Sequence, residues 1–210
     1  MQKYEVIYLK EIASDQLNLE IGSYLMSRQR VGQPLREFIT IKLETTSAQV
    51  IVIDFSQIED VTVSVADELG PKLFRNFVNL WSDKTKQTPY LVYANLSPDL
   101  LNSMERVFRQ DDKELVACLF KQFSDSRFYN HFFVGDGLPD ALREVLNRIY
   151  SLRKANSVQL EDHDIAAASR KLNALMNKYP WLLKREKEML DDRAWTYIYQ
   201  PIVPTYQEIL

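Results

Sequence analysis

Apolar residues gather in five short runs over the first two thirds of the chain. Two of them, VIVI at 50–53 and LVACLF at 115–120, are continuously apolar. Strands covered on both faces of a largely parallel sheet have this pattern, whereas half-exposed strands alternate apolar and polar residues. We therefore predict five strands, at 4–9, 50–55, 90–95, 115–120 and 129–135.

Helical periodicity fills the gaps between these runs. From 64 to 82 an apolar residue recurs every four positions, although Pro71 lacks the N–H that an interior helical turn needs. This helix should therefore kink or restart at Pro71. A second helix is expected at 97–108, with Ser97 as N-cap and Pro98 as its first residue. Strands that alternate with helices predict an α/β domain, a layered sheet with flanking helices.

A stretch with two glycines and a proline, 134–142, separates this region from the tail. We place the boundary there, with an α/β domain at 1–137 and a small α+β module at 138–210. A helix is expected near 139–154, and it could belong to the α/β domain, belong to the module or join the two. An amphipathic helix follows at about 164–179, and then come two β-type runs around LDDR, typical of a hairpin. The apolar stripe of the amphipathic helix consists of Ile165, Ala168, Leu172, Leu175, Met176 and Tyr179.

Composition indicates a globular protein with an apolar core, because 46% of the residues are hydrophobic and only five are glycines. The single cysteine, Cys118, lies in an apolar run and is expected to be a buried, inert thiol. No apolar stretch approaches the roughly 20 residues of a membrane span, and no signal peptide is visible. We expect a cytoplasmic protein without a membrane partner. The net charge of −3 means that any contact with nucleic acid must come from a local cluster.

Signatures of catalysis are missing from the sequence. It has no phosphate-binding glycine motif and no nucleophile elbow. His131 and His163 are far apart, and one apolar cysteine does not complete a zinc site. Asp54, Asp67 and Glu68 could gather at one end of the sheet around a metal, but three acidic residues are a weak signal. We expect no enzymatic activity, no catalytic residue, no cofactor and no metal.

The stretch DFSQIEDVTVSVADELG, 54–70, leaves two roles open for Ser64. SVAD fits a capping box, in which Ser64 would accept a backbone N–H and Asp67 would reach back. Ser64 could instead be a phosphoacceptor or a partner contact at the start of a helix.

Three motifs in order resemble STAS-like domains, which are relatives of the anti-sigma-factor antagonists. The central one is the apolar strand followed by DFSQI and then by Ser64 and ADEL. Upstream, SRQRVGQPLREFI (27–39) is similar to the helix that precedes this strand, and VYANLSPDLLNSMERVF (92–108) resembles the third strand and its helix. The resemblance covers roughly residues 16 to 150.

This resemblance implies a regulatory protein that binds a protein partner. Asp54, Thr62, Ser64, Asp67 and Glu68 would lie at the partner-contacting surface. In that family the serine is phosphorylated by a histidine-kinase-type ATPase, and phosphorylation releases the partner. This chain differs from the antagonists, because Thr62 and Val65 replace the Asp and Gly of their Asp-Ser-Ser-Gly stretch.

The tail segment SRKLNALMNKYPWLLKREKE (169–188) resembles the recognition helix and first wing strand of winged-helix regulators. The alternative function is therefore sequence-specific binding to double-stranded DNA. The same helix and hairpin could instead dock to a protein. Glu186 and Glu188 alternate with the lysines and arginine of 184–187 and weaken the positive charge of that cluster. For DNA, the resemblance implies base contacts and phosphate contacts from Ser169, Arg170, Asn173, Asn177, Lys184, Arg185 and Lys187.

Overall fold

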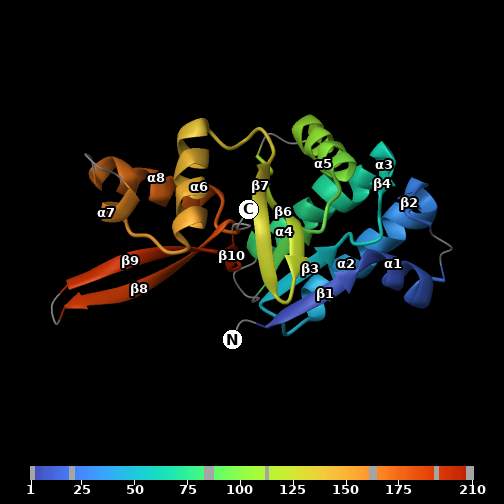
Figure 1. The fold of residues 1–210 in the computed structure, drawn as a ribbon, viewed down its shortest axis with the longest axis horizontal. Coiled ribbons are helices and arrows are strands. Elements are labelled where there is room, and N and C mark those ends of the chain that lie inside the picture. Colours follow the sequence, from blue (N-terminus) through green and yellow to red (C-terminus); the bar gives the residue numbers. More distant parts are fainter. Residues whose placement is uncertain are drawn as a thin grey trace. The chain divides into compact units, whose positions relative to one another are not determined.

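The computed structural model describes residues 3–18, 22–82, 88–111, 114–160, 165–191 and 194–206. The chain forms two compact units, Met1–Gly137 and Leu138–Leu210 (Figure 1). Each unit is described by itself. Among the described residues, no helix combines the length and the apolar character that crossing a membrane requires.

The first unit alternates strands with helices, and three of its helical segments (η) are wide, π-type turns. Its strands are β1 (Tyr4–Tyr8), β2 (Tyr24–Leu25), β3 (Val50–Asp54), β4 (Asp60–Val61), β5 (Tyr90–Ala94), β6 (Ala117–Ser124) and β7 (Arg127–Val134). Its helical segments are α1 (Leu9–Glu11), η1 (Ile12–Gln16), η2 (Arg28–Gly32), α2 (Gln33–Thr45), α3 (Val63–Asp67), η3 (Glu68–Lys72), α4 (Leu73–Ser82) and α5 (Pro98–Asp111).

A mixed sheet forms the centre of the first unit, with its strands in the order β1-β3-β5-β6-β7. The first four strands are parallel, and β7 returns antiparallel to β6. Every residue of β3 is buried, as the continuously apolar run predicts. The predicted α/β class and all five predicted strands are confirmed.

The hairpin of β6 and β7 is longer than its apolar runs indicate. Both strands continue through polar residues to a two-residue turn, where Asp125 and Ser126 have φ values of 49° and 60°. Positive φ at both positions gives the turn type that matches the twist of paired strands.

The predicted break in the long helix is present at Gly70 and Pro71. Gly70 has φ −90° and ψ −106°, which are not helical values, so the chain kinks within η3, ahead of α4. The predicted start of α5 is also confirmed, because Ser97 Oγ accepts the N–H of Leu100 at 3.2 Å. Beneath these helices, Phe74 and Tyr93 pack against Phe108, with ring centroids 5.8 and 6.5 Å away.

The second unit contains three helices followed by a hairpin, within the residues that are described. The elements are α6 (Asp140–Leu152), α7 (Ser157–Leu160), α8 (Ile165–Lys178), β8 (Leu183–Asp191), β9 (Ala194–Pro201) and the short strand β10 (Thr205–Tyr206). Tyr150 joins the parts of this unit, since its hydroxyl donates to the carbonyl of Leu182 and its carbonyl accepts from Thr205. Four residues of the predicted α8 stripe are buried, Ala168, Leu172, Leu175 and Tyr179. The prediction is wrong for Ile165, which is exposed at the first described position of the helix.

Candidate functional site

Asp54 closes β3 and is only 2% exposed. Its carboxylate accepts the backbone N–H of Ser56 at 2.6 Å and the side-chain amide of Asn95 at 2.8 Å. The other end of the Asn95 amide accepts the N–H of Phe123 at 2.7 Å. Asp54 therefore links the ends of neighbouring strands. Its implied place on a partner-contacting surface is wrong, because the carboxylate is buried by the backbone that it organises.

The helix after this strand begins two residues earlier than the capping-box pattern predicts. Thr62 occupies the N-cap position, and its carbonyl accepts the N–H groups of Val65 and Ala66. Ser64 is thus the second residue of α3, and its hydroxyl lies 3.2 Å from that of Thr62. The prediction of Ser64 as the N-cap is wrong, and its side chain remains partly exposed.

Asp67 and Glu68, the acidic pair of ADEL, form ion pairs with arginine and lysine side chains, and Asp67 does not complete a capping box. The implied place of Glu68 on a partner-contacting surface is wrong, because its side chain is buried. Glu68 is 1% exposed, and its carboxylate lies 3.2 Å from Arg28 Nε, 3.1 Å from Arg36 Nη1 and 2.6 Å from Lys72 Nζ. Asp67 pairs with Arg28 and, at 2.9 Å, with Lys72. We call these five residues the Glu68 cluster. The pKa of Lys72 is raised above its ordinary value, first because of the hydrogen bond to Glu68.

Two of the motifs that resemble STAS-like domains meet in this cluster. Arg28, Gly32 and Arg36 recur every four residues along η2 and α2, so they follow one side of the helical segment. Gly32 provides the space for Glu68, because a Cβ at position 32 would lie 3.2 Å from Glu68 Cβ and Cγ. The sequence contains complementary charges, with arginines four residues either side of Gly32 in one motif and two adjacent acidic residues in the other. The sequence alone did not indicate that these two motifs are in contact.

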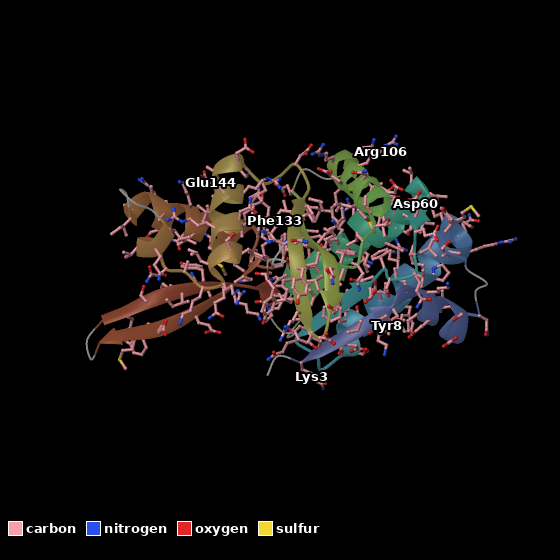
Figure 2. All side chains as sticks on the ribbon, viewed as in Figure 1. Lys3, Tyr8, Asp60, Arg106, Phe133 and Glu144 are labelled. Atoms are coloured by element: carbon pink, nitrogen blue, oxygen red, sulfur yellow. The ribbon has the colours of Figure 1, made fainter. Side chains whose placement is uncertain are left out.

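Exposed apolar side chains lie near the start of α3. β2 pairs with β4 in parallel, and the N–H of Thr62 donates to the carbonyl of Leu25 at 3.0 Å. Leu25 is buried, whereas its neighbours Tyr24 and Met26 are exposed, as is Val63. We call Tyr24, Met26, Thr62, Val63 and Ser64 the α3 edge. Figure 2 labels Asp60, which lies in β4 at this edge.

Tyr24, at the α3 edge, interacts with Glu59. A hydrogen bond to the Glu59 carboxylate raises the pKa of the tyrosine hydroxyl above its ordinary value. Sequence reasoning did not select Tyr24, Met26 or Val63, because nothing local marks an apolar residue as exposed.

The seven candidate DNA contacts do not share one surface. On α8, Arg170, Asn173 and Asn177 are exposed and Ser169 is partly exposed. In the hairpin, Lys184 is partly buried, and burial lowers its pKa to about 8. Arg185 and Lys187 are exposed. Alternation along β8 places Lys187 and Arg185 on the same face and Lys184 on the opposite one.

The suggested metal site is not formed by these residues. Asp54 is bound by Ser56 and Asn95, whereas Asp67 and Glu68 are bound by arginine and lysine. Within the described ranges, no group of three His, Cys, Asp or Glu side chains is arranged to hold a metal ion. His131 packs against the ring of Phe133, and His163 lies outside the described residues.

No protein-family model, curated protein or solved structure matches this chain. The resemblance to STAS-like domains therefore rests on the three sequence motifs and stays a prediction.

Proposed function

We propose that this protein is a non-enzymatic regulatory protein that binds a protein partner through the α3 edge of a STAS-like unit. The observation that carries the proposal is the exposure of Tyr24, Met26 and Val63 around the start of α3. Exposed apolar side chains in one patch with polar neighbours are typical of protein-binding surfaces. The Glu68 cluster fixes η2 against α3 and η3, so this surface is preformed.

The partner that the STAS-like resemblance implies is a histidine-kinase-type ATPase. Such a partner would also explain Ser64, whose partly exposed hydroxyl lies within the α3 edge. Phosphorylation adds about −1.5 to −2 charges, and residues three apart on a helix are neighbours. A phosphate on Ser64 would repel Asp67 and compete with it for Arg28, which is half-exposed. Phosphorylation of Ser64 would therefore disturb the ion pair between Arg28 and Asp67 in the Glu68 cluster, which supports the α3 edge.

The test of this function is capture of the partner from an extract of the native host by the full-length chain. We expect the wild-type chain to capture a histidine-kinase-type ATPase, and Val63→Asp to reduce its recovery by at least about tenfold, since a charge would be desolvated at the interface. The matched control is Ile41→Asp, because Ile41 is equally apolar and exposed but lies on α2. Equal recovery with both variants would refute docking at the α3 edge.

The phosphorylation step has a separate readout in the same experiment. Mass spectrometry of the protein from its host should find a Ser64 phosphopeptide, and Ser64→Glu should lower the recovery of the ATPase. Absence of the phosphopeptide, together with unchanged recovery of the ATPase by Ser64→Glu, would refute regulation by phosphorylation of Ser64. It would not refute docking at the α3 edge.

Sequence-specific binding to double-stranded DNA is the second candidate function. It is supported by the order of elements in the second unit, in which α6, the four-residue α7 and α8 precede the β8–β9 hairpin. That order resembles a winged-helix module with α8 as recognition helix. Duplex binding that is lost in Arg170→Ala would support this candidate.

A further inference from the structure

The β8–β9 hairpin separates its basic from its acidic side chains. Successive residues of a strand point to opposite faces, and residues paired across an antiparallel ladder share a face. One face therefore carries the pairs Arg185–Tyr199, Lys187–Tyr197 and Met189–Trp195. The other face carries the pairs Lys184–Gln200, Glu186–Ile198 and Glu188–Thr196. We call the face that carries Arg185, Lys187 and Met189 the outer face.

The acidic residues are engaged on their own face. Glu188 pairs with Lys154 at 3.0 Å, and Glu186 accepts a hydrogen bond from the Gln200 amide at 3.0 Å. Ile198, which pairs with Glu186, is buried on this face. On the outer face Tyr199 is buried as well, so the exposed part of that face consists of Arg185, Lys187, Met189, Trp195 and Tyr197. The glutamates that interrupt the basic cluster in the sequence therefore project away from the outer face.

On the outer face, each cation lies over an aromatic ring. Arg185 Cζ is 4.7 Å from the centroid of Tyr197, and Lys187 Nζ is 4.6 Å from that of Trp195. These contacts orient the side chains without covering them, since Trp195 is 55% exposed and Tyr197 is 49% exposed. Trp195 and Tyr197 are thus exposed beside two cationic side chains and do not belong to the hydrophobic core.

We propose that the outer face binds single-stranded nucleic acid. Unpaired bases stack on aromatic rings and on guanidinium planes, and the backbone phosphates bind arginine and lysine. Alternate residues of a strand are about 6.7 Å apart, which suits successive nucleotides of an extended chain. An acidic peptide would use the cations and leave the rings without a role. This inference does not depend on partner docking at the α3 edge.

Fluorescence anisotropy of the full-length chain with labelled twelve-nucleotide oligo-dT and oligo-rU tests the proposal. We expect micromolar binding that weakens with salt, with a logarithmic slope of about −0.7 for each phosphate contacted. Trp195→Ala and Arg185→Ala should each weaken binding at least about fivefold, because one stacking base or one phosphate contact is lost. The two oligonucleotides distinguish DNA from RNA as the preferred strand.

The matched control is Arg106→Ala, which removes an exposed arginine from α5 instead of the hairpin. It should leave oligonucleotide binding unchanged, and thermal melting should show that all three variants are folded. Unchanged binding in folded Trp195→Ala would overturn the proposal. Tighter binding to a blunt duplex of the same length, or equally tight binding to a poly-glutamate peptide, would overturn it as well.

Discussion

Replacing Glu68 with glutamine is expected to lower the free energy of unfolding by about 3–5 kcal/mol. The glutamine has nearly the same shape, so packing against Gly32 is kept while the negative charge is lost. Arg36 and Lys72 would then face a neutral amide, which also points an N–H₂ group at one of them. Glu68 is the buried member of the cluster, so loss of its charge leaves the partly exposed Arg36 and Lys72 without the counter-ion that they share, and this is the source of the cost. Urea unfolding, monitored by circular dichroism, measures this change in the free energy of unfolding.

The matched control for Glu68 is Glu105→Gln. Glu105 pairs with Arg109 at 2.6 Å, four residues along α5, but both side chains are exposed. Exposed pairs contribute about 0.2–1 kcal/mol, because water screens them. A loss at Glu68 no larger than the loss at Glu105 would mean that the Glu68 cluster does not hold η2 against η3.

Asp54→Ala is expected to cost about 2–4 kcal/mol of unfolding free energy, because each buried donor left without an acceptor costs about 1–3 kcal/mol. The two donors are the Ser56 N–H and the Asn95 amide. The effect should extend to β6, because Asn95 also binds Phe123 there. Hydrogen exchange should show faster opening of the Phe123 amide.

Asp99→Ala is the comparison for Asp54. Asp99 is an exposed aspartate in the first turn of α5, where a carboxylate contributes about 0.3–1 kcal/mol through the helix dipole. A cost at Asp54 below that range would mean that its hydrogen bonds to Ser56 and Asn95 do not hold the strand ends together.

Local patterns were sufficient for much of the fold. Continuous apolar runs predicted the buried strands, Ser97 with Pro98 predicted the start of α5, and Gly70 with Pro71 predicted the break before α4. In each case the deciding chemistry lies within a few residues of the feature. The polar halves of β6 and β7 were not predicted, because their pairing depends on a turn at Asp125 and Ser126 that lacks glycine.

The candidate site was predicted only in part because its contacts join distant segments. SVAD fits a capping box, yet Asp67 is recruited by Arg28, 39 residues earlier in the chain. Asp54 was predicted at the partner-contacting surface, but it is buried, and its hydrogen-bond partner Asn95 is 41 residues away in the sequence. The face of the hairpin on which Glu186 projects follows from the β8–β9 register, which composition does not reveal.

Photo-crosslinking in the native host tests docking at the α3 edge most directly. A benzophenone side chain would be placed at position 63, or at position 41 as control, and the adducts identified by mass spectrometry. We predict an adduct with a histidine-kinase-type ATPase from position 63 and none from position 41. Adducts of equal yield from both positions, or none from position 63, would contradict the account.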